Sequence, residues 1–254
     1  MSNPIYDDQK IRLIVMLVPV LLYHKIDKPA PDARVRGGYT PLRRFEKQMT
    51  YLKRQGFVFY TASELIEHFR ENGRFPPNSV ALTFDDGWQD NYTNAFPVMR
   101  RLGIKATIFL VPTCIGEVSA KVQAEGESGR AHLTREEILE MSAHGIEFGS
   151  HSMNHRLLHE LTPPDVRFEV EESKRQIEGM LQKPCKVFAY PAGYFNDTAQ
   201  RIIADAGHIA AFSTIYGPAD HLDLYGLNRI EILRRDRFTF QFANKVKPLR
   251  SVQT

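Results

Sequence analysis

Short apolar runs alternate along this chain with longer segments of helical periodicity, and this alternation restricts the fold more than any other feature. A repeated strand-then-helix order implies parallel strands joined by crossover helices. The helices are expected to begin at capping residues, namely Thr40, Thr61, Thr134 and Thr162. We therefore predict an α/β domain with about seven parallel strands, at residues 18–24, 80–85, 106–111, 146–149, 186–190, 210–213 and 227–232.

The residues with catalytic potential come directly after predicted strands. A (β/α) barrel gathers such residues at the C-terminal ends of its strands, whereas an open doubly wound sheet places them at one switch point. Because the candidates follow several different strands, we favour a distorted (β/α) barrel. The chain has 254 residues, of which 43% are hydrophobic, and no clear linker, so we expect a single domain over residues 1–254.

Two adjacent carboxylates, Asp85 and Asp86, end an apolar β-prone run and are followed by Gly87. Neighbouring side chains on a strand point to opposite faces, so both carboxylates can face one cavity only if the strand ends there. His151 and His155 supply imidazoles at an i, i+4 spacing, close enough to share a metal ion. One carboxylate and two imidazoles leave coordination positions open, and the second carboxylate can act as a general base. The arrangement predicts a metal hydrolase.

Composition argues against several other classes of protein. The net charge of +3 comes from 33 basic and 30 acidic residues with no basic tract, so we expect no nucleic-acid partner. The apolar run 13–23 is shorter than the roughly 20 residues of a membrane span, and Asp7 and Asp8 precede it, which disfavours a signal peptide. We expect a cytoplasmic protein, with a shortened precursor of an exported protein as the alternative. Cys114 and Cys185 lack CxxC spacing and are expected to be reduced.

Three motifs stand at the ends of predicted strands, namely Thr83-Phe84-Asp85-Asp86-Gly87, His151-Ser152-Met153-Asn154-His155 and Tyr190-Pro191-Ala192-Gly193. They resemble those of the polysaccharide deacetylases of carbohydrate esterase family 4, which share the NodB-homology domain. The first two together are highly specific, and the third is weak alone. The run Leu21-Leu22-Tyr23-His24-Lys25-Ile26, with Gln55-Gly56-Phe57 downstream, is similar to the branch that acts on poly-N-acetylglucosamine.

The resemblance implies a role for each matching residue. Asp86, His151 and His155 would bind one divalent metal ion, with zinc the usual choice and cobalt, nickel or manganese as alternatives. Asp85 would be the general base that takes a proton from the attacking water. The backbone N–H of Ala192 would help to hold the oxyanion.

The chain departs from the family's pattern in two places. Ala189 stands where an arginine usually steadies the base aspartate, so Arg229 is the candidate substitute. The late Leu-x-His motif that usually supplies the general acid is replaced by Leu227-Asn228-Arg229. In the branch that acts on poly-N-acetylglucosamine the corresponding strand is displaced to the N-terminus, which makes His24 the candidate acid. This assignment requires the first and last strands to be neighbours.

Further residues near the motifs are candidates for substrate binding, because aromatic side chains at a rim can stack on a sugar as well as pack in a core. The candidates are Trp88, Tyr92, Pro191, Tyr194 and Arg229. The polar stretch 112–130 is expected to be a loop beside the site. The other histidines considered are expected to be solvent-facing or structural, namely His132, His144, His159, His208 and His221.

Together these features predict a metal-dependent hydrolase that removes acetyl groups from N-acetylated amino sugars of a glycan. Within the same chemistry, the substrate could instead be an O-acetyl ester or a small C–N amide. From another class, the chain could be a glycan-binding protein that hydrolyses nothing, although the retained Asp85, Asp86, His151 and His155 argue against it. The expected partner is an N-acetylated glycan, and the sequence does not indicate an oligomeric state.

Overall fold

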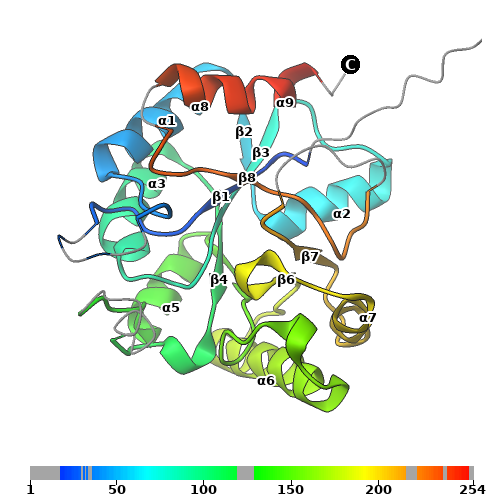
Figure 1. Cartoon of the computed structure of the whole chain (residues 1–254). Helices are drawn as coiled ribbons and strands as arrows, with labels where there is room; N and C mark the ends of the chain where they lie inside the picture. Colours follow the sequence, from blue (N-terminus) through cyan, green and yellow to red (C-terminus); the bar gives the residue numbers. More distant parts are fainter. Residues whose placement is uncertain are drawn as a thin grey trace, which may run out of the picture.

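The computed structural model describes residues 18–29, 31, 33, 36–118, 129–215, 222–236 and 239–251, which form a curled sheet with helices packed around it (Figure 1). The strands are β1 (Val20–Tyr23), β2 (Val58–Tyr60), β3 (Ser79–Phe84), β4 (Thr107–Leu110), β5 (Glu147–Ser150), β6 (Val187–Ala189), β7 (Ala210–Phe212) and β8 (Ile230–Glu231). The helices are α1 (Leu42–Arg54), α2 (Ala62–Asn72), α3 (Phe96–Leu102), α5 (Arg135–Ala143), α6 (Pro163–Leu181), α7 (Asp197–Asp205), α8 (Thr239–Val246) and α9 (Pro248–Ser251). A π-helical turn (Asn91–Ala95) precedes α3, and 3₁₀ turns occupy Pro112–Cys114, Leu158–Glu160 and Pro191–Gly193.

The paired strands of this sheet are parallel, in the order β7-β6-β5-β4-β3-β1-β8. The short strand β2, which the sequence pattern did not indicate, pairs with the first half of β3. The prediction of a parallel α/β sheet curled into a distorted barrel is therefore confirmed. Residues 119–128 of the expected loop lie outside the described residues, as do His221 and the first part of the apolar run 13–23.

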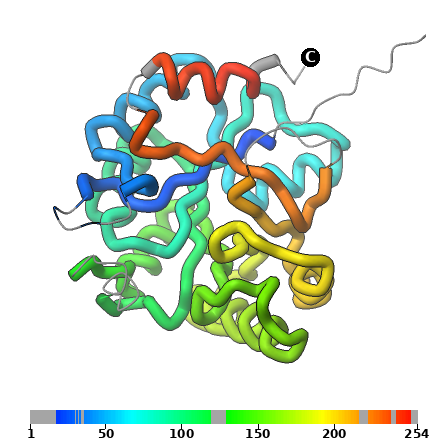
Figure 2. Tube along the Cα trace, viewed as in Figure 1, coloured from blue at the N-terminus to red at the C-terminus, as the bar shows by residue number. Residues whose placement is uncertain are grey.

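The two ends of the strand order approach each other through the segment that leads into β8. Leu21 of β1 pairs with Ile230 of β8, and Leu227 forms a parallel bridge with Phe212 of β7. The Leu227 N–H donates to the Ala211 carbonyl at 3.0 Å. In Figure 2 this orange segment runs beside the blue strand β1. The first and last strands are neighbours, as the assignment of His24 requires.

The helix starts follow the capping pattern with one exception. Thr61 and Thr134 each form a complete capping box, as their spacing predicts. The prediction that Thr40 caps the first long helix is wrong, because α1 begins at Leu42 after Pro41. The Thr40 N–H instead donates to the Lys25 carbonyl at 2.8 Å and holds the chain after β1.

Burial along the sheet fits strands that are covered on both faces. Every residue of β1, β3 and β4 is buried, as is usual where helices flank a parallel sheet. Both cysteines are reduced, as expected, with Cys185 buried and Cys114 partly exposed. In the part of the chain that the structure describes, no helix has both the length and the apolar character needed to cross a membrane.

His208 is buried beside Phe188, and neither ring nitrogen has a hydrogen-bond partner. Burial, with a smaller contribution from the charge of Lys174, lowers its pKa to about 3. Between about pH 6.5 and pH 3, His208 is protonated in the unfolded chain but stays neutral in the folded chain. The free energy of unfolding therefore falls as the pH drops through this range.

We therefore expect His208→Phe to lose less stability than the wild type between pH 7 and pH 4, by about 3 kcal/mol. Urea unfolding at a series of pH values measures this difference. His144→Gln, at an exposed histidine, is the control and should follow the wild type. Identical pH dependence for His208→Phe and the wild type would contradict the prediction.

Candidate active site

The two carboxylates at the end of β3 are separated by an abrupt change in backbone conformation. Asp86 has a φ of 73° and Gly87 a φ of 63°, both in the left-handed region. A Cβ atom on Gly87 would lie 2.8 Å from the Leu110 side chain, so glycine is required at this close approach. The strand therefore ends where the sequence predicts, and both aspartates lie at the C-terminal edge of the sheet.

A second irregular loop presents the two histidines after β5. Ser152 and His155 have φ values of 63° and 55°. The loop is held by Glu169 of α6, which is fully buried and accepts hydrogen bonds from the Asn154 backbone N–H at 2.8 Å and from its side-chain amide at 2.9 Å. The imidazole centroids of His151 and His155 lie 4.9 Å apart as a result.

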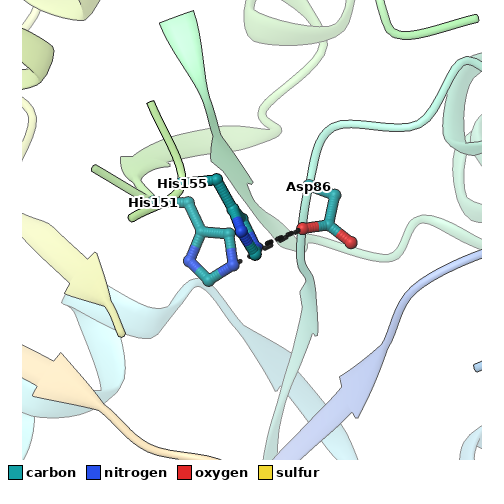
Figure 3. A group of neighbouring side chains, drawn as sticks. All are labelled: Asp86, His151 and His155. Atoms are coloured by element: carbon teal, nitrogen blue, oxygen red, sulfur yellow. Dashed lines mark ion pairs between the residues drawn. The ribbon is translucent and has the colours of Figure 1, made fainter. Parts of the chain in front are cut away.

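Asp86, His151 and His155 converge on one point (Figure 3). The Asp86 Oδ1 atom lies 3.5 Å from His151 Nε2 and 3.2 Å from His155 Nε2. His151 donates from Nδ1 to the Ala189 carbonyl at 2.8 Å, so its Nε2 lone pair faces the other two ligand atoms. Two imidazole nitrogens and one carboxylate oxygen form a donor set that fits a divalent metal ion with coordination positions left open.

Electrostatics keep Asp86 and His151 in the protonation states that metal binding needs. Burial lowers the pKa of His151 to about 4, so the imidazole is neutral near pH 7. Burial alone would raise the pKa of Asp86, but the hydrogen bond and charge of His155 hold it well below its usual value. The site therefore combines a carboxylate with a neutral imidazole at His151.

Asp85 forms a buried two-point ion pair with Arg229. The two guanidinium nitrogens donate to the two carboxylate oxygens, both at 2.7 Å, and the Arg229 Nε donates to the Ser213 carbonyl at 2.8 Å. Burial raises the pKa of Asp85, but Arg229 outweighs it and leaves the pKa below its usual value. Arg229 thus takes the place of the arginine missing at Ala189. The expectation that it also contacts substrate is wrong, because its side chain is fully buried.

His24 lies at the end of β1, next to the end of β3. Tyr23 pairs with Phe84, and the Asp85 N–H donates to the Tyr23 carbonyl at 3.1 Å, so the residues that follow both strands are neighbours. The His24 carbonyl accepts a hydrogen bond from Asn91 at 2.8 Å. Its Nδ1 atom is buried without a hydrogen-bond partner. The structure therefore places His24 beside the aspartates.

The third motif forms a tight turn after β6. Pro191 is buried, and Ala192 is exposed with a φ of 55°. A Cβ atom on Gly193 would clash with Thr214, whose hydroxyl donates to the Ala192 carbonyl at 3.2 Å. The turn is fixed at the same edge of the sheet as Asp86, His151 and His155, because Ala189 of β6 accepts the hydrogen bond from His151.

The structure separates the aromatic candidates for substrate binding. Trp88 is only 4% exposed, so its ring cannot stack on a sugar. The Tyr92 hydroxyl donates to Glu140 of α5 at 2.6 Å. The expectation for Trp88 is corrected, whereas that for Tyr92 stays a prediction. Tyr194 is 61% exposed and lies 5.3 Å from the His159 ring, so its ring remains accessible.

Sequence reasoning missed residues that support the site from a distance along the chain. His132 was expected to be solvent-facing or structural, and it is structural: it is buried, and its Nδ1 donates to the Asp86 carbonyl at 2.9 Å, a link to the site that the sequence did not indicate. Arg130 pairs with Asp90 at 2.7 Å, and Asp90 accepts the Ile26 N–H at 2.7 Å, which joins this loop to the chain after His24. The single hint in the sequence is that Arg130 ends the stretch 112–130, which was expected to lie beside the site.

Comparison with known proteins agrees with this geometry. The polysaccharide deacetylase family model matches residues 72–211, which is more than half of the chain. YxkH of Bacillus subtilis, whose name assigns it to the polysaccharide deacetylases, is 31% identical over 216 residues, or 85% of this chain and 71% of that protein. The chain belongs to the polysaccharide deacetylase family. The resemblance stated from the three motifs is confirmed.

Members of this family with known names or structures share most of the chain. A poly-beta-1,6-N-acetyl-D-glucosamine N-deacetylase of Staphylococcus aureus is 29% identical over 178 residues, which span 66% of this chain but only 59% of that protein. The deacetylase PplD of Streptococcus pyogenes, solved with acetate, has a TM-score of 0.74 and 30% identity, covering 85% of this chain and 92% of that one. IcaB from Ammonifex degensii, 22% identical with a TM-score of 0.71, shares the fold over 92% of this chain and 96% of that one.

Proposed function

We propose that this chain is a metal-dependent deacetylase that hydrolyses the N-acetyl groups of amino sugars in a polysaccharide or oligosaccharide. The observation that carries the proposal is the pairing of Asp85 with Arg229 directly beside Asp86, His151 and His155. A metal-binding protein without hydrolytic activity has no need of a second, separately oriented carboxylate. The name of the Staphylococcus aureus relative supports an N-acetylated glucosamine polymer as substrate.

The metal would be held by Asp86, His151 and His155, and the mixed nitrogen and oxygen donor set favours zinc, with cobalt, nickel and manganese as alternatives. When bound, such an ion supplies a Lewis acid that polarises the acetamide carbonyl and lowers the pKa of the attacking water. The remaining chemistry belongs to the protein's own groups.

Asp85 accepts a proton from the attacking water while Arg229 holds both carboxylate oxygens in place. The water oxygen bonds to the carbonyl carbon, and the backbone N–H of Ala192 donates to the oxyanion that develops. His24 then gives a proton to the sugar nitrogen as the C–N bond breaks, which releases acetate and a free amine. The exposed ring of Tyr194, beside Pro191, offers a surface on which a sugar ring can stack.

The test is acetate release from N-acetylglucosamine oligomers by metal-stripped protein, with and without added Zn²⁺. We expect release only with metal, and a loss of at least about 100-fold in Asp85→Asn, because a positioned general base contributes that much or more. Asp165→Asn, at an exposed acid on α6, is the matched control and should retain full activity.

The alternatives give different results in the same experiment. Release of acetate from O-acetylated xylan but not from the oligomers would indicate an esterase. Binding of the oligomers without any acetate release would indicate a glycan-binding protein. Failure to bind Zn²⁺ would contradict the proposed metal site itself.

A further inference from the structure

The side chain of Asp86 is supported by a stack of three residues, Lys25, Trp88 and His132, which we call the Trp88 stack. The indole of Trp88 lies parallel to the His132 ring, with centroids 4.2 Å apart and an interplanar angle of 24°. The Lys25 ammonium lies over the same indole, 4.5 Å from its centroid. All three side chains are buried, so this stack has a fixed geometry.

Two hydrogen bonds run from the stack to Asp86. The Trp88 Nε1–H donates to Oδ2 at 3.0 Å, and the His132 Nδ1–H donates to the backbone carbonyl at 2.9 Å. They therefore hold both the carboxylate and the left-handed backbone of this residue, whose φ is 73°. Backbone in this region persists only where the surrounding structure holds it.

The two carboxylate oxygens of Asp86 have different partners. Oδ1 is the atom that lies 3.2 Å and 3.5 Å from the two imidazole Nε2 atoms, whereas Oδ2 is occupied by the indole N–H. The indole hydrogen bond uses one lone pair of Oδ2 and fixes the orientation of the carboxylate, so that Oδ1 is the oxygen that faces the imidazoles. Trp88 therefore fixes the direction in which Asp86 presents Oδ1, as outer hydrogen-bond partners do in metal sites generally.

We propose that Trp88 is a positioning residue that directs Oδ1 of Asp86 toward the metal position and thereby sets the metal affinity of the site. The inference rests on the proposed function only in that the site takes a divalent metal. It predicts that the indole N–H, and not merely an aromatic ring, is required for tight binding.

The chain offers a direct spectroscopic readout, because Trp88 is its only tryptophan. We expect Zn²⁺ titrated into the metal-stripped protein to change the tryptophan emission in a saturable way, since the indole is bonded to a metal ligand. The dissociation constant from this titration should equal the one measured by competition with a chromogenic chelator.

Trp88→Phe keeps a ring for the stack but removes the N–H. We expect its Zn²⁺ dissociation constant, measured by chelator competition, to rise by about 10- to 100-fold. Tyr51→Phe, on α1 against Phe242, is the control and should bind Zn²⁺ as the wild type does. Thermal unfolding of the metal-free proteins separates a loss of affinity from a loss of folding.

The outcomes distinguish this inference from the proposed function. Wild-type protein that binds no Zn²⁺ by chelator competition would overturn the metal site and the inference with it. Tight binding that Trp88→Phe shares with the wild type would overturn the inference alone. If Trp88→Phe does not fold, the wild-type titration decides, and an unchanged emission at full Zn²⁺ loading would overturn the inference.

Discussion

Replacing Arg229 by methionine is expected to lower the free energy of unfolding by about 3–5 kcal/mol, because it leaves the buried carboxylate of Asp85 without its partner. Acetate release should fall by about 100-fold or more, since the base loses the two contacts that orient it. Urea unfolding and initial rates on N-acetylglucosamine oligomers measure the two effects separately.

A double variant separates orientation from stability. In Arg229→Met with Asp85→Leu the uncompensated charge is removed, so most of the lost stability should return while activity stays absent. Arg229→Lys keeps the charge but cannot make the two parallel bonds, so it should retain more stability than methionine and still be slow. Wild-type rates in Arg229→Met would show that Asp85 needs no orienting partner.

His24→Gln is expected to reduce the hydrolysis of acetamide groups by about 100- to 10,000-fold, the usual contribution of a positioned acid. An amine is a poor leaving group unless it is protonated, whereas an activated phenolate leaves without a proton. We therefore expect His24→Gln to retain much more of its activity toward p-nitrophenyl acetate than toward N-acetylglucosamine oligomers.

The comparison with Asp85→Asn makes this test specific for the acid. Loss of the base should slow both substrates, because water must be activated in each case. His159→Gln, at a histidine that lies near Tyr194 rather than beside Asp85, is the control for removing an imidazole near the site. Equal losses on the amide and the ester in His24→Gln would argue against His24 as the acid.

The parts of the site that depend on local sequence could be predicted. Asp86, His151 and His155 belong to two short motifs, each at the end of a strand, and parallel strands deliver such ends to one edge. The capping boxes at Thr61 and Thr134 are likewise local, since each depends on residues three apart. Local patterns fix such features before the long-range packing is known.

Other parts depend on packing between distant segments. The contact of Arg229 with Asp85 requires β8 to pair with β1, and the sequence indicated Arg229 only through the missing arginine at Ala189. Trp88 looked like a rim residue, but the left-handed backbone at Asp86 allows the indole to turn back onto that residue's carboxylate. No sequence periodicity encodes such a reversal.

Because β8 is the last strand in the sequence and pairs with β1, the part of the site that depends on this pairing is completed last. The three metal ligands come from loops that follow β3 and β5, whereas the arginine that orients the base comes from the chain just before β8. During synthesis, Asp86, His151 and His155 therefore leave the ribosome before Arg229, which pairs with Asp85. The contact between Arg229 and Asp85 can therefore form only after the last strand has reached its place beside the first.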